Sequence, residues 1–360
     1  MWMEGSTSGV YRMWFQHMDI NRIPFYQYNT IIVGTGAAGL NAAVTLHKLG
    51  QKNIALITEG RYMGTSRNTG SDKQTYYKMT QCGSEPDSVR KMAKTLFEGG
   101  CVDGDIAMAE AAGSLRAFYH LVDIGVPFPF NKSGEYVGYK TDHDPLKRGI
   151  SAGPLTSKYM TECLERQAEE RGIPFFDGYQ AVRLLTEEKD GEKRAAGIIA
   201  LNKQKAASPD ERYAVFSAVN IIWATGGEAG MYQASVYPVS QTGGMGVLLE
   251  AGAVAKNLTE SQFGIASVKH RWNLSGTFQQ CLPRYLSAEQ DGSHEREFLN
   301  DYFDTPRQLL TAIFLKGYQW PFDPRKVEGQ GSSLIDLLVY QETVLKGRRV
   351  FLDFMHTRPR

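Results

Sequence analysis

The chain lacks most features that mark a metal-binding or disulfide-bonded protein. Its 360 residues include only four cysteines, Cys82, Cys101, Cys163 and Cys281, and no two of them form a CxxC pair. This spacing argues against a zinc ribbon, an iron–sulfur cluster or a redox dithiol, and it is compatible with a reducing cytosol. The seven histidines show no HExxH or similar spacing. We therefore expect no metal site.

An excess of one charge and long apolar runs are also missing. Forty basic and thirty-nine acidic residues give a formal net charge of +1, which predicts no general attraction to nucleic acid or anionic lipid. No stretch reaches the roughly 20 apolar residues that cross a bilayer. Residues 1–28 are rich in aromatic residues and methionine but carry several charges, so we interpret them as an N-terminal extension and not as an export signal. These absences predict a soluble, cytoplasmic protein without nucleic-acid or membrane partners, acting on a small molecule.

The sequence does contain a nucleotide-binding pattern near its start. A strand-like apolar run, a GxGxxG turn, a helix-like run and a second strand-like run occupy residues 30–33, 34–39, 40–49 and 53–58. The second strand leads into Glu59, twenty positions after Gly39. A GxGxxG alone is often only a glycine-rich turn, but the strands, the helix and the acid together predict the βαβ dinucleotide fingerprint.

Each key residue of this pattern has a physical role. Gly34 permits the tight turn, and Gly36 lets the backbone approach a pyrophosphate at the positive end of the helix. Gly39 allows the helix to pack closely on the strand, and Glu59 can accept hydrogen bonds from ribose hydroxyls.

The periodicity further along the chain completes a fold prediction. Helical spacing recurs at residues 87–97, 106–124 and 155–171, and strand-like runs follow at 180–186, 195–202 and 213–223. Asp190-Gly191 is a hairpin signal between the first two of these strands. The third ends in Ala224-Thr225-Gly226-Gly227, small residues that let the chain pass close to a cofactor. We predict an α/β protein, Rossmann-like, with a parallel sheet plus a three-stranded β-meander.

The order of these motifs resembles the flavoprotein subunits of fumarate reductase and succinate dehydrogenase, together with L-aspartate oxidase. The matching pieces are residues 33–39, Glu59, the polar loop 65–70, residues 224–227 and the run 244–253. The resemblance covers about residues 29–300. It implies an FAD-binding domain at 29–260 and an inserted α+β capping domain at 261–360, only partly present because the chain ends at Arg360. It also implies hydride transfer between the flavin N5 and a substrate bound between the two domains.

We predict the cofactor-binding residues from these motifs. They are Gly34, Gly36, Ala37, Ala38, Gly39, Glu59, Gly60, Thr65, Ser66, Arg67, Asn68, Thr69, Ala181, Val182, Ala224, Thr225, Gly226 and Gly227. Family members with covalent flavin carry Ser-His-Thr in the polar loop, whereas Arg67 and Asn68 follow Ser66 here. We therefore expect non-covalent FAD.

The substrate motifs of the family are matched less well. The Gln-(Phe/Tyr)-His-Pro-Thr element is reduced to residues 262–266, and Gly243 stands where an Asp is usual. The segment around Arg284 keeps its arginine but has Gln280 and Cys281 where the family has acids. The sequence therefore predicts a substrate other than fumarate or succinate.

The candidate catalytic residues are Glu260, Gln262 and Arg284, which the resemblance places near the flavin or the substrate. His270 and Arg271 are further candidates for binding an anionic substrate. Scattered charges of this kind usually form structural ion pairs or remain solvated, so the structural alternative stays open.

Three classes of function remain open on the sequence. An FAD-dependent reductase or dehydrogenase is favoured, with an electron-donor protein or subunit as a candidate partner. A nicotinamide-dependent dehydrogenase is second, and the meander and residues 224–227 argue against it. A non-catalytic flavin-binding or electron-relay protein, or an incomplete chain, is third, because of the early end at Arg360.

Overall fold

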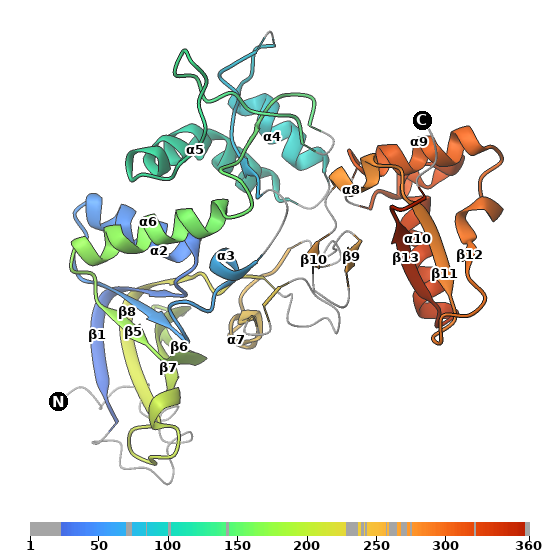
Figure 1. Ribbon diagram of the computed structural model, residues 1–360. Coiled ribbons are helices and arrows are strands. Elements are labelled where there is room, and N and C mark those ends of the chain that lie inside the picture. Colours follow the sequence, from blue (N-terminus) through green and yellow to red (C-terminus); the bar gives the residue numbers. More distant parts are fainter. Residues whose placement is uncertain are drawn as a thin grey trace. The chain divides into compact units, whose positions relative to one another are not determined.

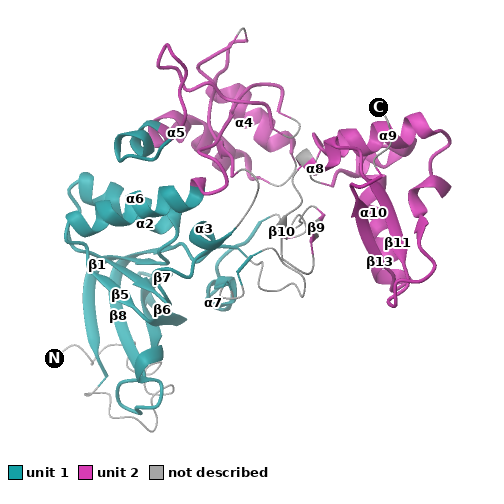
Figure 2. Cartoon of the chain, in the orientation of Figure 1, with its two compact units in different colours: residues 1–69, 119–127, 157–256 teal, residues 70–118, 128–156, 257–360 magenta. Residues whose placement is uncertain are grey.

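The chain forms two compact units, each assembled from three separate stretches (Figure 2). Unit 1 comprises residues 1–69, 119–127 and 157–256, and unit 2 comprises 70–118, 128–156 and 257–360. Residues 70–118 and 128–156 thus group with the C-terminal part of the chain. The boundary at residue 260 between an FAD-binding domain and a capping domain remains a prediction. This computed structural model describes residues 23–69, 74–83, 85–99, 102–141, 144–227, 237–238, 241, 243–256, 258, 265–267, 272–273, 276–319 and 322–356.

A six-stranded mixed sheet forms the centre of unit 1, in the order β5-β2-β1-β8-β7-β6 (Figure 1). Its strands are β1 (Phe25–Val33), β2 (Ile54–Thr58), β5 (Phe175–Asp177), β6 (Tyr179–Lys189), β7 (Glu192–Asn202) and β8 (Tyr213–Trp223). Strands β5, β2, β1 and β8 run parallel, while β7 is antiparallel to both β8 and β6. Strand β8 therefore belongs to the parallel sheet and to the meander at once. The predicted α/β fold is confirmed.

Strand β1 lies inside the sheet because its second half is a run of β-branched residues. Ile31 and Ile32 are fully buried between β2 and β8. The strand begins at Phe25, before the apolar run, because Tyr26 and Tyr28 alternate onto the core side. The ring of Tyr26 stacks on Phe216 with centroids 4.9 Å apart. Aromatic packing thus extends the strand beyond the apolar run.

The β6–β7 hairpin confirms the predicted turn. Asp190 and Gly191 adopt φ values of 55° and 79°, and Lys189 pairs with Glu192 across them. Two consecutive positive φ values are the requirement of a type I′ turn, whose twist matches that of the flanking strands.

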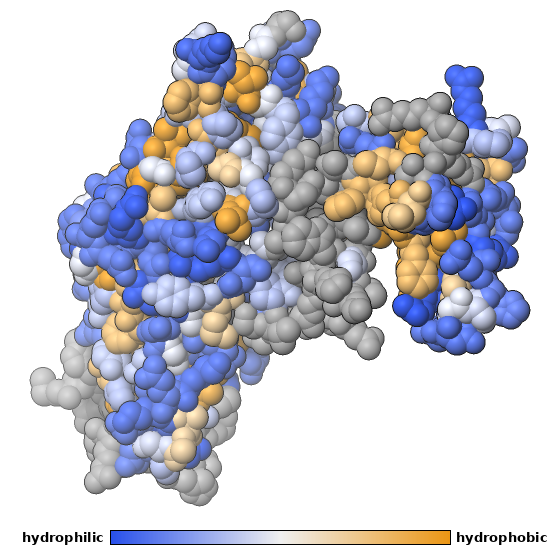
Figure 3. Space-filling model, viewed as in Figure 1, coloured by the Kyte–Doolittle hydropathy of each residue, from blue (hydrophilic) through white to orange (hydrophobic). Residues whose placement is uncertain are grey.

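Helix α2 (Ala37–Lys48) starts directly after the glycine turn and packs on β1, β2 and β8 (Figure 1). It buries Leu40, Ala43 and Val44, one face at helical spacing. Unit 1 also holds the one-turn helix α3 (Thr65–Asn68), α6 (Thr156–Glu170, most of its length), the 3₁₀ turn Lys203–Lys205 and α7 (Met245–Glu250). In Figure 3 the visible surface of α6 is mainly hydrophilic.

The first part of unit 2 contains α4 (Val89–Glu98), most of α5 (Gly104–Asp123), and the short strand pair β3 (Tyr76–Tyr77) and β4 (Gly149–Ile150). Ser88 caps α4 by accepting a hydrogen bond from Lys91 N at 3.2 Å. Phe118 is the centre of an aromatic cluster with Tyr76, Phe128 and Tyr136.

The last part of unit 2 consists of many short helices, turns and strands. It contains β9 (Ala266–Ser267), β10 (Trp272–Asn273), α8 (Gly276–Gln280), β11 (Arg284–Ala288), β12 (Arg296–Glu297), Phe298–Asp301 as a 3₁₀ turn, α9 (Pro306–Lys316), the 3₁₀ turns Pro324–Lys326 and Glu328–Gln330, α10 (Leu334–Tyr340), the π-helical turn Gln341–Leu345, and β13 (Arg349–Asp353). Strand β11 lies between β12 and β13.

The sequence spacing of Ser333 and Asp336 predicts a capping box at the start of α10, and this prediction is wrong. Ser333 lies at the N-cap position but makes no capping hydrogen bond. Its hydroxyl instead accepts from Asp323 N at 3.0 Å, and Asp336 forms an ion pair with the buried Lys316 of α9. The contacts between helices outweigh the local capping signal.

In the part of the chain that the structure describes, no helix is both long and apolar enough to cross a membrane. The same residues contain no group of three or more His, Cys, Asp or Glu side chains that could hold a metal ion.

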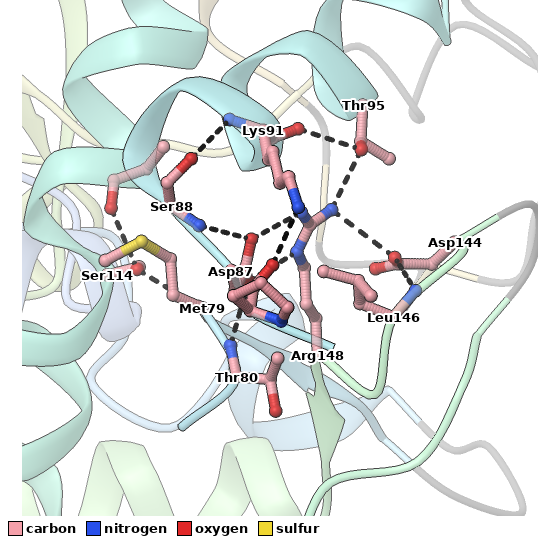
Figure 4. A network of polar contacts seen from close by, with 12 residues as sticks. Met79, Thr80, Asp87, Ser88, Lys91, Thr95, Ser114, Asp144, Leu146 and Arg148 are labelled. Carbon is pink, nitrogen blue, oxygen red and sulfur yellow. Dashed lines mark hydrogen bonds and ion pairs between the residues drawn. The ribbon is translucent and has the colours of Figure 1, made fainter. Parts of the chain in front are cut away.

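A buried ion pair fixes the first part of unit 2 (Figure 4). The guanidinium of Arg148, 1% exposed, binds both carboxylate oxygens of Asp87 at 2.7 and 2.9 Å. It also donates to Thr95 Oγ1 at 2.9 Å and to Asp144 Oδ1 at 3.3 Å. Burial raises the pKa of Asp87, but the hydrogen bonds from Arg148, Thr80 N and Ser88 N outweigh it and hold the pKa below its usual range.

We expect Arg148→Ala to lower the free energy of unfolding by about 3–5 kcal/mol, because it leaves two carboxylates buried without their cation. Since the pKa of Asp87 is lowered in the folded state, the contribution of the pair should persist above about pH 4 and be lost as the pH falls further. Urea unfolding of both proteins at pH 7 and pH 3 measures this. Lys94→Ala, which removes an exposed ion pair with Glu98 on α4, is the control and should cost at most about 0.5 kcal/mol. Equal losses in the two variants would contradict the assignment.

Candidate functional site

A cleft lies at the carboxyl ends of β1, β2 and β8 in unit 1. Parallel strands bring these ends to one edge of a sheet, where ligands of open α/β sheets bind. The residues that line the cleft are Val33, Gly34, Thr35, Gly36, Ala37, Ala38, Ile57, Thr58, Glu59, Gly60, Met63, Gly64, Thr65, Ser66, Tyr179, Gln180, Ala181, Trp223, Ala224, Thr225, Gly226, Gln241, Gly243 and Gly244.

The glycines of the turn have separate roles in the structure. Gly34 has a φ of +109°, and a Cβ there would lie 2.3 Å from the carbonyl oxygen of Ala224. A Cβ on Gly39 would lie 2.0 Å from the carbonyl oxygen of Gly34. These two glycines are therefore required by the fold itself. Gly36 has an ordinary extended backbone, and its Cβ would meet only Ser66 Oγ at 3.3 Å.

Among the described residues, no acidic side chain caps the N-terminus of α2 or lies in its first turn. Gly36 is its N-cap, so there is no side-chain cap, and its first turn carries no acidic residue. Its first N–H meets a neutral side chain, since Ala37 N donates to Ser66 Oγ at 3.3 Å. The unshared N–H groups and the positive end of the helix dipole thus face the cleft, as in phosphate-binding sites.

Glu59 follows β2 as predicted, and it has a partner that the sequence does not suggest. Its Oε1 lies 2.7 Å from Lys203 Nζ in the 3₁₀ turn after β7. Both side chains are partly exposed, so this pair is a weak constraint. Glu59 lines the cleft whether or not the pair forms, at a place where a ribose hydroxyl can reach it.

The polar loop is tied to the end of β8 by Gln241. Thr65 Oγ1 donates to Gln241 Oε1 at 3.2 Å, and Gln241 Nε2 donates to the carbonyl oxygen of Thr225 at 2.8 Å. Gln241 is nearly buried, so one amide side chain joins two walls of the cleft.

Two buried polar atoms in the cleft wall have no protein partner. Trp223 Nε1 and Thr225 Oγ1 make no hydrogen bond to any of the residues that the structure describes. Gly244 packs closely against them, because a Cβ there would lie 2.5 Å from Thr225 Oγ1 and 3.1 Å from Trp223 Nε1. An indole N–H can only donate, so the wall fits a ligand that brings acceptor oxygens or ring nitrogens. The phosphates, sugars and flavin ring of FAD bring both.

The structure brings together most, but not all, of the predicted cofactor residues. Those that line the cleft are Gly34, Gly36, Ala37, Ala38, Glu59, Gly60, Thr65, Ser66, Ala181, Ala224, Thr225 and Gly226. Those outside its lining are Gly39, Arg67, Asn68, Thr69, Val182 and Gly227. Gly39 packs against the turn and Val182 against a small apolar core, whereas Asn68 Nδ2 donates to the carbonyl oxygen of Gly64 at 3.1 Å.

Arg67 lies against an acid of α6. Its Nη2 is 2.6 Å from Glu165 Oε2, and its side chain is largely buried there. Arg67 therefore points to a partner within the protein.

The predicted catalytic residues fall in two places. Glu260, Gln262, His270 and Arg271 lie outside the described residues. Arg284, on β11 of unit 2, pairs with Asp353 at 2.7 Å and with Glu297 at 3.0 Å. The hydrogen bond from Arg284 lowers the pKa of Asp353 to about 2, so both charges are satisfied within the small sheet.

Sequence reasoning missed several residues of the cleft, notably Thr35, Tyr179, Trp223 and Gln241. Trp223 and Thr35 adjoin predicted residues, and that adjacency was a usable signal. Gln241 and its partner Thr65 are 176 positions apart in the chain, and no local sequence pattern indicates such a contact.

A glycine turn, an uncapped helix N-terminus and a strand-end acid, with a meander sharing β8, define a dinucleotide-binding protein of the Rossmann-like class. The FAD binding domain family matches residues 29–283, and the chain belongs to this family. The family match confirms the prediction that the cofactor is FAD.

Curated relatives agree with the resemblance found in the sequence. L-aspartate oxidase of Agrobacterium fabrum is 28% identical over 242 residues, which is 65% of this chain and 42% of the relative. The 8-methylmenaquinol:fumarate reductase flavoprotein subunit of Wolinella succinogenes is 27% identical over 271 residues, 74% of this chain and 42% of the relative. The chain spans about half the length of the curated relatives it matches.

A solved structure of a quinol-fumarate reductase with menaquinol molecules shares the fold. Its TM-score is 0.64 at 19% identity, over 93% of this chain and 56% of the solved one. The predicted membership of the fumarate reductase, succinate dehydrogenase and L-aspartate oxidase family is confirmed.

We expect Gly36→Val to abolish FAD binding in a protein that still folds, because its backbone is unstrained and the added methyls fill the phosphate cradle. Glu59→Ala should only weaken binding, by roughly ten- to a hundredfold, the scale of hydrogen bonds to a charged group. Titration of flavin fluorescence gives the affinities, and the thermal midpoint checks folding. Gly113→Val, in open space on α5, is the control and should bind normally. Equal affinity of Gly36→Val and the unchanged protein would refute the role of the turn.

Proposed function

We propose that this chain binds FAD non-covalently in the cleft of unit 1 and acts as an FAD-dependent oxidoreductase on a small organic substrate. The observation that carries the proposal is one cleft lined by the uncapped N-terminus of α2 and by two buried polar atoms, Trp223 Nε1 and Thr225 Oγ1, which have no hydrogen-bond partner among the described residues. It lies in a chain of the FAD-binding family whose named relatives are oxidases, reductases and dehydrogenases.

Different residues of the cleft would contact different parts of the cofactor. The N–H groups of α2 and the bare backbone at Gly36 would bind the pyrophosphate, and Glu59 would accept from ribose hydroxyls. Trp223 and Thr225 would donate to polar atoms of the cofactor further along the wall. Gln241 and Thr65 would keep the two walls at a fixed distance. When bound, FAD supplies the two-electron chemistry, as acceptor or donor of a hydride.

The composition of the polar loop supports non-covalent binding. A covalent link needs a nucleophilic side chain beside the flavin, and the loop offers Ser66 and Arg67 where covalent members have Ser-His. Among the described residues that line the cleft, none is a histidine, cysteine or lysine, although tyrosine is represented by Tyr179.

The substrate is proposed to be neither fumarate nor succinate. A dicarboxylate needs cationic groups that are free to bind it, and Arg284 is already neutralised by Asp353 and Glu297. Glu260 and Gln262 remain proposed contacts of a different substrate. An electron-donor protein or subunit as partner, and a cytoplasmic location, belong to the same proposal.

Acid precipitation of the flavin-loaded protein should release the yellow colour into the supernatant, because only non-covalent contacts hold FAD. Absorbance of pellet and supernatant at the flavin band measures the partition. A gel-filtered sample kept at neutral pH is the control and should retain its flavin. A yellow pellet after washing would contradict non-covalent binding.

We expect no appreciable fumarate reduction or succinate oxidation by the flavin-loaded protein. One missing oriented donor typically costs about a hundred- to a thousandfold in rate, and the sequence lacks several groups of the dicarboxylate site. The assay is anaerobic, with reduced viologen dye and fumarate. Reduction of the bound flavin by dithionite is the control that the cofactor is redox-active. Turnover near the typical enzyme rate of about 10 per second would overturn the proposal.

A further inference from the structure

We infer that Glu165 is a positioning residue for FAD, which fixes the loop of residues 61–67 against α6 through Arg61 and Arg67. The inference rests on the proposed function, since it concerns how tightly the cleft holds its cofactor. It assigns Arg67 to the loop's attachment and not to direct contact with the cofactor.

One carboxylate of α6, Glu165, binds both Arg61 and Arg67, and Arg61 also pairs with Glu169 of the same helix. Glu165 Oε1 accepts from Arg61 Nε at 2.9 Å and lies 2.7 Å from Arg61 Nη2. Glu165 Oε2 accepts from Arg67 Nη2 at 2.6 Å. The Glu165 side chain is only 11% exposed, and those of Arg61 and Arg67 are 18% and 14% exposed. Little solvent is therefore available to replace either ion pair.

Aromatic rings hold the two guanidinium groups in these positions. The Arg61 guanidinium lies 4.1 Å from the centre of the Phe175 ring, on β5. That of Arg67 lies 5.2 Å from the centre of the Tyr62 ring. Cation–π contacts at these distances help to hold each arginine in position for its carboxylate.

The residues between the two arginines form a wall of the cofactor cleft. Met63, Gly64, Thr65 and Ser66 line it. Ser66 contacts the first N–H of α2, and Thr65 contacts Gln241. The loop therefore faces the cofactor on one side and Glu165 on the other.

The loop cannot hold this shape by itself. Helix α3 has four residues. So short a helix does not form without tertiary contacts, because nucleating a helix costs more free energy than the hydrogen bonds of a single turn contribute. Two arginines held by one buried acid supply such contacts at both ends. Loss of Glu165 would remove the acid that pairs with Arg67 and one of the two acids that pair with Arg61, and the wall would then be held less firmly.

The same geometry separates two roles for Arg67. If Arg67 positions the loop, losing either Arg67 or Glu165 weakens FAD binding, and losing both is no worse than the more harmful single change. If Arg67 instead binds a phosphate of FAD, releasing it from Glu165 strengthens binding, and the affinity depends more steeply on salt.

The test compares Glu165→Gln, Arg67→Gln and the double variant with the unchanged full chain. FAD dissociation constants are measured by fluorescence titration at low and high salt, with visible circular dichroism of the bound flavin. Glu162→Gln, the same change on an exposed acid of the same helix, is the matched control. Thermal midpoints without FAD report folding.

We expect Glu165→Gln and Arg67→Gln each to weaken FAD binding roughly tenfold or more. The double variant should be non-additive, the flavin dichroism altered, and the Glu162→Gln protein unchanged. Equal or tighter binding by a folded Glu165→Gln protein would overturn the inference while leaving the proposed function intact. If Glu165→Gln does not fold, Arg67→Gln decides: weaker binding with an unchanged salt dependence supports positioning, and any other result overturns it. If the unchanged chain does not bind FAD, the inference and the proposed function both fail.

Discussion

The close backbone approach between the ends of β1 and β8 is the constraint on which the rest of unit 1 depends. Ala224 N donates to the carbonyl oxygen of Val33 at 2.7 Å, and Gly34 N donates to that of Ile57 at 2.8 Å. Three strands are thus joined within two residues of the turn, at a place where Gly34 has no room for a side chain. This junction sets where α2 starts, and the start of α2 sets where its free N–H groups point. The cleft is a consequence of strand packing.

Charge around the cleft follows one rule: the cations described at its rim have carboxylate partners. Lys203 pairs with Glu59, and Arg61 and Arg67 pair with Glu165. Attraction for an anionic cofactor then comes chiefly from oriented backbone dipoles, which are fixed in place and cost no reorganisation on binding. Such a site discriminates by shape and hydrogen-bond direction more than by net charge.

The sequence correctly predicts the parts of this structure that are determined by residues close to one another in the chain. The β-branched run of β1, the glycine turn and the Asp190-Gly191 hairpin are each specified within a few positions, so their local pattern suffices. The direction of Arg67 is different, because its partner Glu165 lies 98 positions away. Strand β5 has three residues and exists through pairing with β2. At Ser333 and Asp336 the local signal favoured a helix cap, and the distant Lys316 took the acid instead. Long-range partners, which a single sequence does not reveal, decided each of these cases.

One boundary between the two units falls inside helix α5. Residues of α5 through Phe118 group with unit 2, whereas Tyr119 and those after it group with unit 1. The chain passes between the units at this helix and also after residues 69, 127, 156 and 256. A single recombination point or proteolytic cut therefore leaves the units joined elsewhere, and neither could be gained or lost as one contiguous gene segment.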